Sequence, residues 1–238
     1  MGRPLRVCPG GHRTRYVTEM TDAPISPSAP GSSADVVRTW DARAERYLQL
    51  FRYELEGKPY DLEVLRAFAE RVGAGGRVYD AGCGPCGHVT ALLSAYGLDT
   101  LGIDLSPRCV ALARREQPGC RFAVMDQRAV TGGPLDGLVA YYSLHDQPKR
   151  LLPDTLASWA AAIRPGGQLL IVAKEGEGDG VIADPLGGEL CVYWAEFTAY
   201  ELRRAAHEAG FGTDDCTVRE AYENEIPARR VYLAATRR

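Results

Sequence analysis

The feature that most constrains this chain is a glycine-rich turn between a short apolar strand and an apolar helical stretch. Residues 77–81 (Arg-Val-Tyr-Asp-Ala) have a strand pattern, residues 82–87 are Gly-Cys-Gly-Pro-Cys-Gly, and residues 88–96 continue with helical spacing. Glycines let the backbone bend sharply and let a ligand lie against bare peptide. This order of elements predicts a nucleotide-binding turn at the first strand of an α/β sheet.

Two acidic residues refine the expected ligand. Asp104 ends the next apolar run, residues 100–103, about 20 residues downstream, where an acid can bind both hydroxyls of a ribose. Asp80 lies two residues before the first glycine, at the carboxyl end of its strand. A carboxylate there would repel a pyrophosphate and suits a ligand that carries an ammonium group.

The rest of the chain alternates short apolar strands with amphipathic helices. The expected strands are 77–81, 100–103, 121–124, 137–141, 168–173, 211–220 and 229–236, and the expected helices are 35–56, 61–72, 86–96, 107–117, 154–163 and 198–210. Residues 175–189 are rich in glycine and acids and are expected to form a loop. The pattern predicts an α/β fold: a seven-stranded, mostly parallel, doubly wound sheet that ends in an antiparallel hairpin.

The chain of 238 residues divides into a tail and one domain. Residues 1–33 are rich in Gly, Pro, Ser, Thr and Arg without periodicity, so we expect a disordered tail, with translation starting at Met1 or Met20. Residues 34–238 form the expected domain, with a helical cap at 34–73 and a Rossmann-like core at 74–238.

Charge and hydropathy exclude several classes of protein. A net charge of -3 gives no basic field for nucleic acid. No apolar run approaches the ~20 residues that span a bilayer, and no secretory signal is visible, so we expect a cytoplasmic protein without membrane partners. No pairs of Cys and His have the spacing of zinc ligands, so no metal is expected.

Five segments together resemble the class I S-adenosylmethionine (SAM) dependent methyltransferases of the small-molecule type. They are residues 78–84, 102–106, 121–126, 135–145 and 163–167, in the family's order and spacing. The resemblance extends over residues 35–236. It implies SAM as cofactor and methyl transfer to a small organic acceptor, by a monomer or homodimer. Alanine- and arginine-rich usage suggests, by analogy, a bacterial enzyme of natural-product metabolism.

The resemblance also implies which residues bind the cofactor. Asp80 and the backbone of residues 82–84 face the methionine part, Asp104 binds the ribose, and Asp126 binds the adenine amino group. The expected cofactor residues are Tyr47, Asp80, Gly82, Cys83, Gly84, Gly87, Asp104, Leu105, Met125, Asp126, Gln127 and Tyr141. The alternatives are that the acids cap helices or lie in solvent, and that Tyr47 packs in the core.

The acceptor side is predicted from position. His145 follows the fourth expected strand, where the family places the donor methyl, and is the candidate general base. The alternative is that His145 caps a helix or shapes the pocket. The candidate acceptor-binding residues are Tyr53, Tyr142, Glu175, Tyr193 and Trp194. They do not distinguish an oxygen, nitrogen or carbon acceptor.

Three other interpretations stay open at this point. A SAM-binding protein that catalyses a pericyclase-like step without methyl transfer would have the same cofactor motifs. A nicotinamide oxidoreductase has a similar fold, although Asp80 and the terminal hairpin argue against it. Cys83-Gly-Pro-Cys86 matches the thioredoxin tetrapeptide, but it lies inside the glycine turn and lacks the preceding tryptophan.

Overall fold

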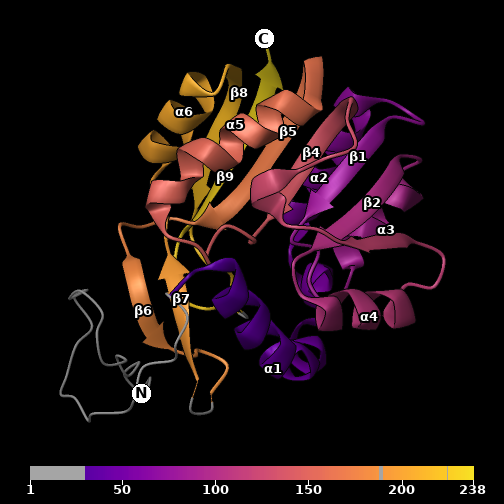
Figure 1. Ribbon diagram of the computed structural model, residues 1–238. Helices are drawn as coiled ribbons and strands as arrows, with labels where there is room; N and C mark the ends of the chain where they lie inside the picture. The colour runs from indigo at the N-terminus through magenta and orange to yellow at the C-terminus, as the bar shows by residue number, and fades with distance from the viewer. Residues whose placement is uncertain (1–29, 188–189, 224) are drawn as a thin grey trace.

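Seven strands form one sheet in the order β3-β2-β1-β4-β5-β9-β8 (Figure 1). The computed structural model describes residues 30–187, 190–223 and 225–238. The strands are β1 (Arg77–Ala81), β2 (Asp99–Asp104), β3 (Arg121–Val124), β4 (Leu135–Tyr141), β5 (Ile163–Lys174), β8 (Phe211–Arg219) and β9 (Arg230–Arg237). β9 runs antiparallel to both of its neighbours, β5 and β8, and the other described strand pairs of this sheet are parallel. The predicted fold class is therefore confirmed.

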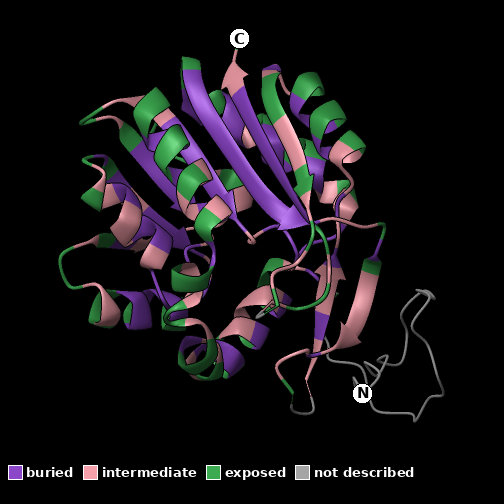
Figure 2. Ribbon diagram, turned by 180° about the vertical axis from the view of Figure 1, so that it is seen from behind, coloured by how far each residue is buried: buried purple, intermediate pink, exposed green. Residues whose placement is uncertain are grey.

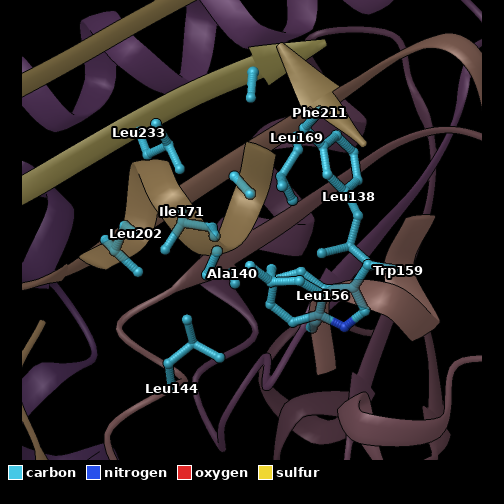
Figure 3. Close-up of a cluster of buried hydrophobic side chains, with 14 of the residues drawn as sticks. Leu138, Ala140, Leu144, Leu156, Trp159, Leu169, Ile171, Leu202, Phe211 and Leu233 are labelled. Carbon is cyan, nitrogen blue, oxygen red and sulfur yellow. The ribbon is translucent and has the colours of Figure 1, made fainter. Parts of the chain in front are cut away.

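Consecutive strand residues face opposite sides of the sheet, and each side is apolar. Leu138 and Leu169 pack with Trp159 in a cluster under α5 (Leu152–Ala162) and α6 (Ala199–Glu208), as Figure 3 shows. Their neighbours Val139 and Leu170 pack on the other face, under α2 (Pro59–Val72) and α3 (His88–Ala95). The central strands are accordingly buried on both faces (Figure 2).

The N-terminal helices do not act as one cap. Helix α2 lies in the layer against the sheet, whereas α1 (Ser33–Phe51) packs against α4 (Pro107–Glu116) beside the carboxyl ends of the parallel strands (Figure 1). Ser32 caps α1 by accepting a hydrogen bond from Asp35 N, so the structured part begins before residue 34. Residues 1–29, most of the expected tail, lie outside the described residues.

The prediction of one helix over 35–56 was wrong at its end. Helix α1 stops at Phe51, and a separate 3-10 turn, η1 (Glu54–Gly57), leads into α2. Pro59 takes the first position of α2, where its missing N–H costs no hydrogen bond. Two further 3-10 turns are η2 (Gln127–Ala129) and η3 (Lys149–Leu151).

The prediction of a loop over 175–189 was also wrong. Strand β6 (Asp179–Ala183) pairs antiparallel with β7 (Cys191–Ala195), and the two form a separate small sheet near α1 (Figure 1). The apolar residues of β6 are few and follow several glycines and acids, so local composition concealed the strand. No described helix is both long and apolar enough to span a membrane.

Candidate active site

Asp80 is a buried carboxylate at the end of β1. The residue is 1% exposed, and the Thr90 hydroxyl on α3 donates to its Oδ2 across 2.6 Å. No cation among the described residues lies within ion-pair distance of it. Burial raises the pKa of Asp80 to about 7. A carboxylate in this state gains stabilisation from a ligand that brings a positive charge.

The glycine turn has one packed and one open side. Gly82 has φ +73°, and a Cβ there would lie 2.3 Å from Ser143 Cβ. Gly84 has φ +62°, and nothing lies within 4 Å of the position of a Cβ. A side chain at position 82 would therefore collide with Ser143 in the loop after β4, so glycine is required there. Gly84, in contrast, presents bare backbone to open space.

Asp104 is positioned at the end of β2 by two backbone donors. Gly84 N–H donates to Oδ2 at 3.0 Å, and Ser106 N–H donates to Oδ1 at 2.8 Å. The residue is 9% exposed, and burial raises the pKa of its carboxyl to about 6. Each oxygen retains a lone pair, so the carboxylate can accept from two neighbouring hydroxyls.

These groups line a cleft that we name the cofactor pocket. It is open to solvent on one side. Every predicted cofactor residue lines it except Gly87, which begins α3 and packs beside Phe122. Sequence reasoning assigned Tyr142 to the acceptor side and missed the other lining residues, which are Val36, Trp40, Glu54, Cys86, His88, Val89, Arg128, Ser143, Asp146 and Gln147.

One of the missed residues has unused hydrogen-bonding capacity. Gln147 is 3% exposed, and neither its amide nitrogen nor its amide oxygen has a partner. A buried amide without partners costs free energy, so a ligand that bonds to Gln147 would recover it. No local pattern marks this glutamine, because its position depends on the loop after β4.

Asp126 and Gln127 lie at the pocket, but protein groups already bind their polar atoms. Arg128 donates to both carboxylate oxygens of Asp126, and Ser33 Oγ donates to Oδ2 at 3.0 Å. Gln127 donates to the Ser143 carbonyl at 2.7 Å and accepts from its hydroxyl at 3.1 Å. These side chains fix η2 against the loop after β4.

The two cysteines of the turn are not activated thiols. Both Cys83 and Cys86 are free and buried. Burial raises the pKa of Cys86 to about 12 and holds the pKa of Cys83 well above its usual value. A thioredoxin-like thiol requires a lowered pKa, so the structure argues against the redox interpretation.

A second cleft, here named the acceptor pocket, adjoins the first. The two share Tyr142, Trp40, Tyr47, Glu54 and Asp146. Of the predicted acceptor-side residues, the structure brings Tyr53, Tyr142, Trp194 and His145 to this pocket.

Glu175 and Tyr193 do not line the acceptor pocket. Glu175 is bound by Arg229 at 2.6 Å, and Tyr193 donates its hydroxyl to Asp179 at 2.7 Å. Both side chains are used in surface contacts around the small β6–β7 sheet and the end of β5.

Helix α1 closes one side of both pockets through Asp146. The Asp146 carboxylate accepts hydrogen bonds from Trp40 Nε1 at 3.0 Å and from the Arg43 guanidinium at 2.8 Å. The Arg43 guanidinium also lies 4.0 Å from the centre of the Trp40 ring. Because these partners are about 100 residues apart in sequence, only the fold reveals the contact.

His145, the predicted base, uses both ring nitrogens within the protein. Its Nδ1–H donates to the Ala195 carbonyl at 2.6 Å, and its Nε2 accepts from Lys174 N–H at 3.3 Å. The residue is 3% exposed, and burial lowers its pKa to about 3. In this arrangement His145 joins β5 to β7 and has no free nitrogen for a substrate proton.

The family model described as a methyltransferase domain matches residues 78–167, which include the glycine turn and both acids. These residues form a methyltransferase domain of the SAM-dependent kind. The predicted family is thereby confirmed, and this enzyme's buried Asp80 and Asp104 lie at the strand ends where the resemblance places them.

The similarity to solved structures of the same fold extends over most of this chain. The 1,6-didemethyltoxoflavin-N1-methyltransferase of Burkholderia thailandensis, with 1,6-didemethyltoxoflavin and S-adenosylhomocysteine bound, is 24% identical, with a TM-score of 0.68 over 91% of this chain and 93% of that one. The magnesium protoporphyrin IX methyltransferase of Synechocystis with bound SAM is 15% identical, with a TM-score of 0.69 over 90% of this chain and 100% of that one. A DhpI complex with S-adenosylhomocysteine is 20% identical, with a TM-score of 0.68 over 88% and 98%. At these identities the likeness shows the shared fold.

Proposed function

We propose that this enzyme transfers the methyl group of SAM to a small organic acceptor bound in the acceptor pocket. The observation that supports this most directly is the junction of the two pockets at Tyr142. The side chain lines both clefts, so ligands in the two pockets would meet beside it. We also propose, by analogy, that the acceptor is a bacterial natural product.

The residues of the cofactor pocket fit the parts of SAM. Asp80 offers a buried carboxylate to the ammonium group, and Asp104 offers two oxygens to the ribose diol. Gly84 offers bare backbone, and Gln147 offers an unpartnered amide. SAM supplies an activated methyl group when bound, so alignment of donor and acceptor is the main task left to the protein.

Two of the structural neighbours support a small-molecule acceptor. The Burkholderia enzyme contains 1,6-didemethyltoxoflavin, and the Synechocystis enzyme is a magnesium protoporphyrin IX methyltransferase. The acceptor pocket here has aromatic walls from Tyr53, Tyr142 and Trp194. Such walls suit a ring-containing organic molecule.

Transfer of label tests the proposal directly. The enzyme is incubated with methyl-labelled SAM and fractionated bacterial metabolites, and products are followed by mass spectrometry. We expect a labelled small molecule together with one equivalent of S-adenosylhomocysteine. Conversion of a metabolite without consumption of SAM would instead support the non-methylating alternative, and the Asp104→Ala variant serves as the control with weakened cofactor binding.

A further inference from the structure

The acceptor pocket contains more positive than negative side chains. Four cations line it, and three carboxylates face them: Arg43, Lys58, Lys174 and Arg230, with Glu54, Asp146 and Glu225. Charges removed from water need partners. The pairing of these groups therefore shows which charge is left for a ligand.

Three of the four cations are paired within the protein. Arg43 lies 2.8 Å from Asp146, and Arg230 lies 3.4 Å from Glu225. Lys58 is bound by Glu54 and also lies 3.2 Å from Glu225. These contacts use all three carboxylates of the pocket.

Lys174 is the cation that remains. Among the described residues, no carboxylate lies within 4.0 Å of its Nζ, and no hydrogen bond of that nitrogen is found. The nitrogen lies 3.8 Å from the centre of the Trp194 ring. The residue is 9% exposed, so its ammonium has little water around it.

The backbone of Lys174 is held firmly at the end of β5. Its N–H donates to His145 Nε2, and its carbonyl accepts from Phe197 N–H at 3.0 Å. Trp194 in turn stacks on His145 with ring centres 5.2 Å apart. This framework directs the Lys174 side chain along the aromatic wall of the acceptor pocket.

The surroundings also make the Lys174 ammonium easier to deprotonate. Burial, and then the charge of nearby Arg230, lower the pKa of Lys174 to about 7, while Glu54, Glu196 and Asp146 act in the opposite direction. The adjacent His145 is neutral near pH 7 because its pKa is about 3. Near neutral pH, Lys174 is therefore present as both amine and ammonium.

We propose that Lys174 accepts the proton from an acidic O–H or N–H group of the acceptor and then binds the resulting anion. This inference rests on the proposed methyl transfer. The neutral amine takes the proton and becomes an ammonium. The electron pair left on the acceptor atom forms the bond to the methyl carbon as the methyl–sulfur bond breaks, and its electrons stay on sulfur. The ammonium then releases the proton to water.

The inference names an acceptor class, namely a compact ring with a phenol-, enol- or imide-like group. Where ring substituents lower the pKa of such a group towards that of Lys174, proton transfer between the two is close to balanced. Lys58 does not fit this role, because its Nζ is already paired with Glu54 and Glu225. His145 does not fit it either, because both of its nitrogens are bound.

The test uses 4-nitrophenol, whose phenolate absorbs at longer wavelength than the phenol. The probe is titrated at pH 6 into enzyme saturated with S-adenosylhomocysteine, for wild type, Lys174→Met and the matched control Lys149→Met. Lys149 is paired with Glu201 at 3.0 Å and does not line the acceptor pocket. Melting temperature and affinity for S-adenosylhomocysteine verify that each variant is folded.

We expect wild type and Lys149→Met to bind the probe as phenolate, and Lys174→Met to bind phenolate about tenfold more weakly or not at all. Wild type that binds no phenolate, or Lys174→Met that binds it like wild type, would overturn the assignment of Lys174. The label-transfer assay reports separately on the proposed function. Phenolate binding without any methyl transfer would overturn that function and leave the anion site standing.

Discussion

The Thr90 hydroxyl donates a hydrogen bond of 2.6 Å to Asp80 inside the core, and it is the only side chain among the described residues that does so. The backbone N–H of Thr90 also donates to Asp80, but neutral donors do not fully compensate a buried negative charge. Asp80 is therefore an unfavourable residue for the folded enzyme without ligand, and a favourable one when a cation binds. This conflict between stability and binding leads to the first prediction.

Asp80→Asn should raise the stability of the ligand-free enzyme and abolish tight SAM binding. The pKa of Asp80 is about 7 in the folded protein against 3.8 for a free carboxyl, so the folded state binds more protons between these pH values. Its contribution to the free energy of unfolding falls as the pH rises through that window. We expect a stability gain of roughly 1–4 kcal/mol at pH 8 that vanishes near pH 4. Urea unfolding at both pH values, with calorimetry of SAM binding, measures the two effects, and equal SAM affinity would contradict the assignment.

Asp104→Ala should weaken SAM binding by about 1.5–3 kcal/mol, because it removes charge-assisted hydrogen bonds to the ribose. The control is Asp99→Ala at the other end of the same strand, where the exposed Asp99 pairs with Arg121. Calorimetry should show unchanged affinity for the control. If folded Asp104→Ala binds SAM as wild type does, the predicted ribose contact is wrong.

Gly84→Ala should lose SAM affinity with little additional loss of stability beyond the backbone strain. Gly97→Ala is a matched control, because Gly97 also has a positive φ and nothing within 4 Å of its added Cβ. Both variants should cost about 1 kcal/mol of folding free energy or somewhat more. Only the methyl group at residue 84 should obstruct the cofactor, so equal SAM affinities in the two variants would refute a close approach at Gly84.

His145→Ala should destabilise the fold by about 2–4 kcal/mol, since it leaves the Ala195 carbonyl and the Lys174 N–H without their partner. The folded pKa of His145 is about 3 against a free value of 6.5, so its contribution to stability is present above pH 6.5 and is lost as the pH falls towards 3. The stability difference between wild type and variant should therefore shrink in acid. A stable His145→Gln enzyme with hundredfold lower turnover and a lost rate inflection near pH 6.5 would restore the base role.

Cys83 and Cys86 should react slowly with iodoacetamide near neutral pH, because burial raises the pKa of both thiols. We expect Cys86→Ala to retain SAM binding and wild type to show no activity in an insulin-reduction assay. Rapid alkylation of the folded enzyme, protected by SAM, would show that the turn opens more readily than this structure indicates.

The strands, the glycine turn and the two cofactor acids could be predicted because their signals are local. A buried strand is a short apolar run, and a residue at its carboxyl end lies at the carboxyl edge of a parallel sheet whatever the rest of the chain does. Asp80 and Asp104 follow this rule, and both line the cofactor pocket. The small β6–β7 sheet does not follow it, because two short strands without a large apolar face have no distinct pattern.

The amino-acid sequence by itself determined the sheet, its edge and the acids that line the cofactor pocket, since each depends on neighbours a few residues away. The tertiary structure alone decided what His145 and Lys174 do. The carbonyl of Ala195 occupies one nitrogen of His145 from 50 residues away, and the pocket acids pair with the other cations and leave Lys174 free. Whether a titratable group is bound or available depends on partners that only the folded chain brings within hydrogen-bonding distance.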